Sequence, residues 1–260
     1  MTDTPLLTLR NKIDAFDNEI LRLLEQRTAV VEEVAVYKKQ SGAAVFIRPN
    51  REAQIIRRLI KQRTKKSVQP ALITQLWRDL MMASLQLECP FSVAVCNTGS
   101  HALLAARNHF GALTPLQSYD TPIAALNAVA ENSALLAVLS CPSTDSWWTA
   151  FTEPRYHGIN VVFKLPFLAV KNAPAFLVLG RVPFEPSGDD KTVVLIDKQD
   201  AAPLPTSTAY SVLAQHQNKV LLELHGFYTP DTPLDGLPTK IQYLGGYATP
   251  LDFVARMQYI

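Results

Sequence analysis

Several polar residues in the first 88 positions have types and spacings that could bind a small anion. Arg27 and Lys38 are 11 residues apart, which at about 100° per helical residue leaves them about 20° apart, on one face of a helix. Arg10 precedes Arg27 by 17 residues and lies about 100° away around the same helix. Ser84 and Glu88 form an i,i+4 pair, so they are neighbours on another helix. Arginine suits carboxylates because its charged fork is bidentate, so this set could hold a small anion.

One long helix must carry the first three of these residues. Apolar side chains recur every three or four positions from Leu6 to Tyr37, and neither Pro nor Gly interrupts residues 6–41. We therefore expect one helix about 50 Å long, ended by Ser41-Gly42. A helix of that length exposes more apolar stripe than two short companions can cover, which favours a partner chain.

Two shorter helices are predicted to follow. Pro49 stands at an N1-like position and opens a helix that runs to about Gln62. Pro70 opens the next helix, which ends near Glu88. The N-terminal region is therefore predicted to be an all-α module of three helices.

The strings that contain these residues resemble the all-helical chorismate mutase family. The resemblance covers nearly all of residues 5–88 and rests on residues 9–27, 34–38, 48–52 and 83–84. It implies an intertwined dimer of three-helix protomers that converts chorismate to prephenate. It also implies a pocket completed by an arginine from the other subunit, which here would be Arg10. Chorismate would be the substrate, and no cofactor or metal would be required.

The resemblance assigns the cations to the charged groups of the substrate. Arg27 and Arg51 would hold substrate carboxylate, and Lys38 would bind the ether oxygen and a carboxylate. Chorismate is a dianion whose pericyclic rearrangement leaves partial negative charge on the ether oxygen. Catalysis therefore needs a rigid cage that fixes the chair-like conformer and donors aimed at that oxygen.

The remaining assignments concern the polar side of the substrate. Glu52 would bind the ring hydroxyl, and Ser84 would contact a carboxylate. Arg48 stands where the family often has Asp, so a polar contact near the hydroxyl is altered or lost. Glu88 stands where Gln commonly donates to the ether oxygen, and an ionised Glu can only accept. We therefore expect activity to fall as the pH rises and Glu88 ionises, unless burial keeps its carboxyl protonated.

Residues 90–260 have a different sequence pattern, which predicts an α/β or α+β region. Short apolar runs alternate with helical stretches, and 15 of the 18 prolines lie beyond residue 88. The segment order is similar to a prephenate dehydratase followed by a regulatory domain of the ACT type. We expect three domains, at residues 1–89, 90–185 and 186–260.

The dehydratase-like region lacks the residues that the resemblance requires. Pro174 and Ala175 stand where Thr and Arg would be, and residues 96–98 replace the Gly-Pro-Glu before Gly99 in the glycine-rich loop. A dehydratase must protonate a leaving hydroxyl and clamp carboxylates, so dehydratase activity is predicted to be absent. The strings that bind phenylalanine in relatives are also missing from the C-terminal tail.

Composition excludes several classes of protein. With 48% apolar residues in 260 positions, the chain can form hydrophobic cores and is not expected to be disordered. Three cysteines without a CxxC pair argue against a disulfide framework or zinc knuckle, and the five histidines lack ligand spacing, so we expect no metal. With neither a leader peptide nor a long apolar run, we expect a cytoplasmic protein that binds no membrane.

Two rival hypotheses compete with a chorismate mutase function. The basic cluster at residues 57–66 could suggest nucleic acid, but without interleaved aromatic residues it is better explained as solvated helix and loop, so no nucleic-acid partner is expected. The second rival is a non-catalytic regulatory or binding protein derived from a bifunctional mutase and dehydratase. In that case Arg48 and Glu88 would have ended the mutase activity.

Overall fold

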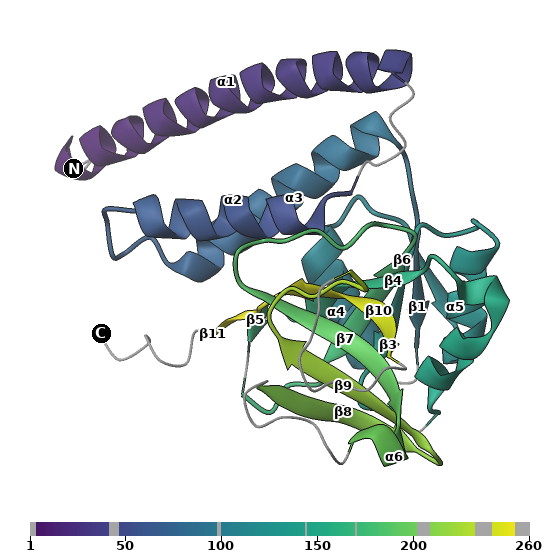
Figure 1. The fold of residues 1–260 in the computed structure, drawn as a ribbon. Coiled ribbons are helices and arrows are strands. Elements are labelled where there is room, and N and C mark those ends of the chain that lie inside the picture. Colours follow the sequence, from purple (N-terminus) through teal and green to yellow (C-terminus); the bar gives the residue numbers. More distant parts are fainter. Residues whose placement is uncertain are drawn as a thin grey trace. The chain divides into compact units, whose positions relative to one another are not determined.

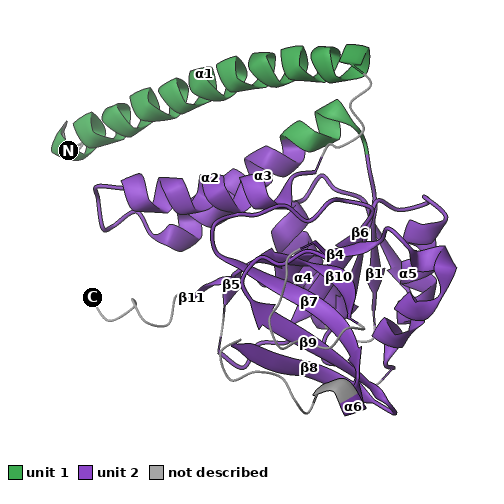
Figure 2. Cartoon of the chain, in the orientation of Figure 1, with its two compact units in different colours: residues 1–46, 84–90 green, residues 47–83, 91–260 purple. Residues whose placement is uncertain are grey.

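The structure is a computed structural model that divides into two compact units (Figure 2). Unit 1 comprises Met1–Phe46 with Ser84–Pro90, and unit 2 comprises Ile47–Ala83 with Phe91–Ile260. The structure describes residues 4–41, 47–97, 100–143, 145–169, 171–201, 209–231 and 241–252. Gly42 and Gly99, which the sequence analysis singled out, lie outside these ranges.

Unit 1 is built on one long helix, α1 (Thr4–Ser41), and also contains the end of α3 (Pro70–Glu88) (Figure 1). The predicted helix is confirmed and begins two residues before Leu6. Its apolar stripe is exposed along most of its length, with Phe16 at 69% and Tyr37 at 71% of their full accessible surface. A stripe of this kind is the surface that a partner chain would cover.

Unit 2 begins with α2 (Pro49–Gln62) and most of α3, and the predicted bounds of both helices are confirmed. Pro49 occupies the first turn of α2, where its missing N–H is not needed. The buried residues of α2 recur at helical spacing on one face, and two of them, Ala53 and Ile56, pack with Phe167. The packed face of α2 therefore turns toward the sheet of the same unit.

A parallel βαβαβ segment forms one end of that sheet. It consists of β1 (Val93–Cys96), α4 (Ser100–Phe110), β2 (Leu116–Tyr119), α5 (Pro122–Ala130) and β3 (Leu136–Ser140). Strands β2 and β3 both pair parallel with β1. Thr121 caps α5, since its Oγ1 accepts a hydrogen bond from Ala124 N at 3.1 Å. The segment provides the α/β character that the alternating pattern predicts.

The remaining strands extend this segment into one nine-stranded sheet in the order β2-β1-β3-β6-β4-β10-β7-β9-β8. The added strands are β4 (Asn160–Leu165), β6 (Phe176–Gly180), β7 (Asp190–Asp197), β8 (Tyr210–His216), β9 (Lys219–His225) and β10 (Gln242–Ala248). Short elements are η1 (Trp147–Thr152), η2 (Pro154–Tyr156), β5 (Leu168–Ala169), α6 (Lys198–Ala201) and β11 (Leu251–Asp252). The fold is thus a helical N-terminal region followed by a mixed α/β region.

Strand β10 joins the two halves of the α/β region. It pairs parallel with β4 and antiparallel with β7, so strands from both sides of residue 185 belong to one sheet. A bulge lies between Tyr243 and Gly246, where a Cβ on Gly246 would lie 2.2 Å from the Lys191 carbonyl oxygen. Glycine is therefore required where these strands approach each other. The division at residues 89 and 185 stays a prediction.

Candidate functional site

Four of the predicted site residues form two contacts within unit 1. Arg27 Nη1 donates to Ser84 Oγ at 2.6 Å, and Lys38 Nζ lies 2.5 Å from Glu88 Oε2. The first residue of each pair comes from α1 and the second from the last part of α3. The Lys38 and Glu88 side chains are 20% and 11% exposed, so the ion pair is largely shielded from solvent. Residues 50 or more positions apart therefore meet as two cation–acceptor pairs.

Arg10 also lies on α1, but it is far along the helix from Arg27. Its side chain is exposed, and the 17 residues that separate it from Arg27 correspond to about 25 Å of helix. Arg10 and Arg27 of one chain therefore cannot contact the same small molecule.

The other three predicted residues begin α2, in unit 2. Arg48 is the N-cap residue and is exposed, without a side-chain hydrogen bond to the helix. Arg51 is also exposed. Glu52 is buried, and its Oε2 lies 2.9 Å from Arg78 Nη1 on α3. The three residues therefore have different environments although they are close in sequence.

Arg78 is a residue that the sequence analysis missed. Its side chain is 3% exposed, and Nη1 also lies 3.1 Å from His109 Nε2 on α4. Its guanidinium lies over the Phe167 ring at 4.7 Å from the centroid. A signal was present in the sequence, because Arg78 is four residues after Thr74 and four before Met82, both buried on α3. A charge on a buried helical stripe requires a partner.

Burial controls the titration of this network. It raises the pKa of Glu52 to about 7, although the neighbouring Arg78 opposes the rise. Burial also lowers the pKa of Arg78 and holds that of His109 well below 6.5, with the Arg78 charge adding to the second effect. His109 is therefore neutral and, because Arg78 can only donate, its Nε2 is the acceptor.

The Glu52→Gln variant is expected to remove part of the pH dependence of stability. Folded Glu52 keeps its proton up to about pH 7, whereas the unfolded chain releases it near pH 4.5. The wild-type free energy of unfolding therefore falls as the pH rises from 4.5 to 7, by about 3 kcal/mol relative to the variant. Urea unfolding followed by tryptophan fluorescence measures this difference.

His109 has the opposite effect, because its lowered pKa causes stability to be lost as the pH falls below 6.5. This contribution is common to the wild type and the variant and cancels in the comparison. Parallel curves for the two proteins between pH 4.5 and 8 would contradict a raised Glu52 pKa.

A second buried ionic cluster lies on the sheet. Glu223 Oε2 is 2.8 Å from Lys164 Nζ and also accepts a hydrogen bond from the Tyr247 hydroxyl, while Lys191 Nζ is 3.9 Å from Oε1. Burial acts to raise the pKa of Glu223, but the hydrogen bonds from Lys164 and Tyr247 outweigh it and the pKa is lowered. Glu223 is therefore an ionised carboxylate that links strands β4, β10, β7 and β9.

Arg57 departs from the expected solvated basic cluster. Its Nη1 donates to Ser187 Oγ at 2.9 Å, and its Nη2 donates to the carbonyl oxygens of Asp189 at 2.8 Å and Thr249 at 3.0 Å. The interpretation as a solvated residue is therefore wrong for Arg57, because the loops of the same unit supply acceptors that the sequence pattern does not reveal. Arg58, by contrast, is exposed.

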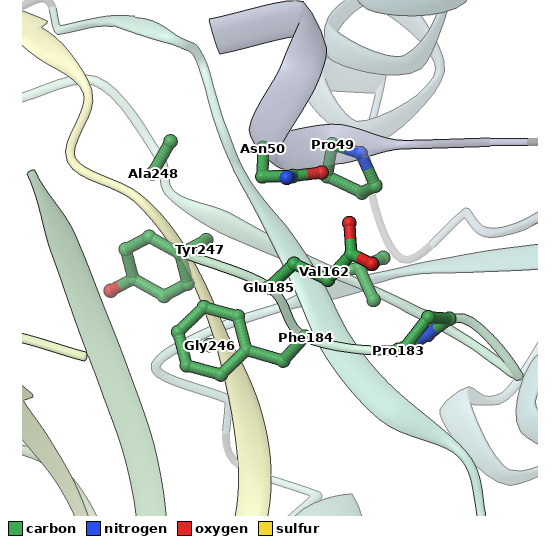
Figure 3. A pocket seen from close by; sticks show the side chains of 9 residues that line it. All are labelled: Pro49, Asn50, Val162, Pro183, Phe184, Glu185, Gly246, Tyr247 and Ala248. Atoms are coloured by element: carbon green, nitrogen blue, oxygen red, sulfur yellow. The ribbon is translucent and has the colours of Figure 1, made fainter. Parts of the chain in front are cut away.

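The crevice beside the start of α2 is too small to hold chorismate (Figure 3). Asn50, Phe184 and Tyr247 are among its lining residues, and its volume of about 10 Å³ suits one water molecule. The nearby Cys141 is not an activated nucleophile, since burial raises the pKa of its thiol to about 11. Ligand-sized space in unit 2 must be sought elsewhere.

The helical part of the chain belongs to a known class of domain. Residues 9–89 match the family model described as chorismate mutase type II, so this region is a chorismate mutase type II domain. None of the helices in the described ranges combines the length and apolar content needed to cross a bilayer. No group of three or more His, Cys, Asp or Glu residues that could hold a metal ion occurs among the described residues.

Curated relatives extend the likeness beyond this domain. The bifunctional chorismate mutase/prephenate dehydratase of Pseudomonas aeruginosa is 33% identical over 138 residues, which cover 51% of this chain and 36% of that protein. The bifunctional enzyme of Stutzerimonas stutzeri is 35% identical over 111 residues, covering 41% of this chain and 30% of that protein. An alignment of 138 residues is too long for residues 1–89 and reaches into the α/β region. The chain thus matches about a third of the length of these relatives.

Two solved structures are similar at a low level. One is described as GqqA, a novel type of quorum quenching acylase, with TM-score 0.40 and 16% identity over 60% of this chain and 93% of that one. The other is a prephenate dehydratase from Streptococcus mutans, with TM-score 0.37 and 12% identity over 61% of this chain and 98% of that one.

Proposed function

We propose that this protein is a chorismate mutase, which rearranges chorismate to prephenate in aromatic amino acid biosynthesis. The observation that carries the proposal is the pair of contacts Arg27–Ser84 and Lys38–Glu88 within the matched domain. Each contact holds a cationic side chain in a fixed position before substrate arrives. Preorganised donors of this kind stabilise charge that develops in a transition state without the cost of reorganisation.

Each side chain has a distinct role in this proposal. Arg27 and Arg51 bind substrate carboxylate, and Lys38 donates to the ether oxygen as the C–O bond breaks. Ser84, already bound to Arg27, adds a carboxylate contact. Bond breaking and bond formation occur within one molecule, so the protein fixes the conformer and stabilises charge but supplies no nucleophile.

Glu52 binds the hydroxyl group of the substrate in this proposal. Its Oε2 is held by Arg78, so the other oxygen, Oε1, would accept the hydroxyl hydrogen bond. Arg48 replaces the Asp found at this point in the family and supplies an additional cation near that side. The assignment of Glu52 to the substrate hydroxyl is supported by its fixed carboxylate, whereas the exposed Arg48 adds no support.

We further propose that the working form is a homodimer in which Arg10 enters the pocket of the partner subunit. The exposed apolar stripe of α1 supports a second chain along that helix. The distance of about 25 Å between Arg10 and Arg27 on one helix supports a role for Arg10 in the other pocket. A cytoplasmic location belongs to the same proposal.

Mixing two inactive variants is expected to restore activity if pockets are shared. Arg10→Ala and Arg27→Ala homodimers each lack one cation in both pockets. A mixed dimer contains one pocket with both substitutions and one intact pocket, so about a quarter of wild-type turnover should return after random exchange of subunits. Chorismate turnover before and after unfolding and refolding the mixture measures this. Turnover that stays at the level of the separate variants would contradict the shared pocket.

The Glu88→Gln variant is expected to raise kcat/KM for chorismate. An ionised Glu88 attracts Lys38 and faces developing negative charge, whereas a glutamine amide can donate a hydrogen bond to the ether oxygen. Initial rates of both proteins at pH 7.5 decide this, and a kcat/KM of the variant equal to or below that of the wild type would contradict it.

We propose no dehydratase activity for the α/β region, because Pro174 and Ala175 lack the hydroxyl and guanidinium that the reaction requires. A rival function, a non-catalytic binding protein, rests on Arg48 and Glu88, which stand where the family often has Asp and Gln. The rival predicts binding of ligands by the second half of the chain without turnover of chorismate.

One experiment separates these functions. Purified full-length protein is incubated with chorismate at pH 5 and pH 7.5, and the loss of chorismate absorbance and formation of prephenate are followed. Turnover that disappears in Arg27→Ala supports the mutase, and absence of turnover at both pH values would leave the binding protein. Prephenate is then supplied alone, and formation of phenylpyruvate would overturn the proposed absence of dehydratase activity.

A further inference from the structure

A cavity of about 230 Å³ in unit 2 lies beside Arg78, and none of its lining residues is one assigned to chorismate. Helix α3 contributes Thr74 and Arg78 to its wall, and α4 contributes Ala105. The segment that leads into β5 contributes Phe167 and Leu168. Its volume is comparable to a small organic molecule rather than to a water molecule.

Arg78 has hydrogen-bonding capacity left over at this cavity. Among the residues that the structure describes, the partners of its side chain are Glu52 Oε2 at 2.9 Å and His109 Nε2 at 3.1 Å, and both contact Nη1. Nε is buried and has no hydrogen-bond partner among the described residues. The edge formed by Nε and Nη2 is one that can bind both oxygens of a carboxylate. A buried guanidinium with a vacant edge is unusual, because buried polar groups are normally satisfied.

The rest of the wall defines the body of a ligand. Thr74 Oγ1 is buried and, within the described ranges, is likewise without a hydrogen-bond partner. Ala105, Phe167 and Leu168 add apolar surface, and the Phe167 ring already stacks below the guanidinium at 4.7 Å. The wall also includes the polar residues Gln75, Asn108 and His109. It therefore combines a cation and several polar side chains with apolar surface, which is typical of sites for small ligands.

We propose that this cavity is a binding site for a small monocarboxylate with an apolar, ring-sized body. The carboxylate binds the Nε–Nη2 edge of Arg78, one of its oxygens accepts from Thr74 Oγ1, and the body packs on Phe167. Because Arg78 also holds Glu52, the site connects the cavity to a residue that the proposed mutase uses. Binding itself does not depend on the mutase proposal.

Charge balance gives the site a measurable signature. The ionisable groups around it are Glu52 on α2, Arg78 on α3 and His109 on α4, and His109 is neutral. A second carboxylate on Arg78 repels ionised Glu52, which can relieve the repulsion by taking a proton, since burial already raises its pKa to about 7. Binding of the ligand therefore takes up a proton near neutral pH and weakens as the pH rises.

Calorimetric titration of the full chain with phenylacetate at pH 6 tests the proposal. We expect saturable binding of one phenylacetate per chain, with affinity about tenfold or more above that for phenylacetamide, which lacks the charge, and for acetate, which lacks the ring. Repeating the titration at pH 7.5 in buffers of different ionisation enthalpy should reveal proton uptake. No saturable heat with phenylacetate, or equal affinity for phenylacetamide, would overturn the proposal.

Two matched variants locate the bound probe. Ala105→Met fills the cavity and is expected to weaken phenylacetate binding about tenfold or more, whereas Leu104→Met alters the exposed neighbouring side chain and should not. Arg27→Ala should also leave phenylacetate binding unchanged, which separates this site from the proposed mutase pocket. Equal affinities of Ala105→Met and wild type would place the probe elsewhere and contradict the proposal.

Discussion

Replacing Arg27 with alanine is expected to lower kcat/KM for chorismate by about a hundredfold to a thousandfold. In the wild type the guanidinium donates to Ser84 at 2.6 Å and, in the proposed site, binds a substrate carboxylate. Alanine removes the carboxylate contact in both the ground state and the transition state. The substrate would then sample conformers that cannot rearrange, so kcat should fall as well as the apparent affinity. Initial rates over a range of chorismate concentrations give both parameters.

Arg22→Ala provides the matched control for this prediction. Arg22 lies on the same helix, but its partner is the exposed Glu19, three residues away. Its removal changes the helix charge by the same amount without touching Ser84, so kcat/KM should stay within about threefold of wild type. Equal losses in Arg22→Ala and Arg27→Ala would attribute the effect to α1 as a whole and remove Arg27 from the site.

Local patterns predicted the helices well because their boundaries are encoded by neighbouring residues. Pro49 and Pro70 mark the starts of α2 and α3 by their fixed backbone angle and missing donor, so both helices were placed correctly. The edge strands β2 and β8 are not marked in this way. Their side chains are mostly half-buried or exposed, so they lack the continuous apolar runs of buried strands such as β1 and β9.

Long-range pairing explains what the sequence could not predict about the site. The spacing of Arg27 and Lys38 on one helix face indicated a common site, but their acceptors on α3 follow only from packing. Glu52 was assigned to substrate by the family resemblance, and its pairing with Arg78, which is 26 residues further along the chain, does not follow from a local pattern. Buried ion pairs depend on which helices pack together, and helix periodicity alone does not contain that information.

Replacing Arg78 with methionine is expected to destabilise unit 2 by about 3–5 kcal/mol at pH 8. Methionine fills a similar volume but leaves the buried Glu52 carboxylate without its counter-charge. At pH 5 the loss should be much smaller, because Glu52, whose pKa burial raises to about 7, is then protonated in the folded protein. Urea unfolding followed by tryptophan fluorescence is suited to this test, since Trp77, Trp147 and Trp148 all lie in unit 2.

A double substitution distinguishes the ion pair from simple loss of packing. Arg78→Met combined with Glu52→Gln removes both charges, so most of the stability lost at pH 8 should return. Arg58→Met is the matched control, because Arg58 is exposed and its removal should change stability by less than about 0.5 kcal/mol. If the double variant is as unstable at pH 8 as Arg78→Met, the loss arises from the contacts of Arg78 with Phe167 and His109 and not from an isolated Glu52 charge. That outcome would also weaken the link between the cavity and Glu52, because the guanidinium would then act through packing and not through charge.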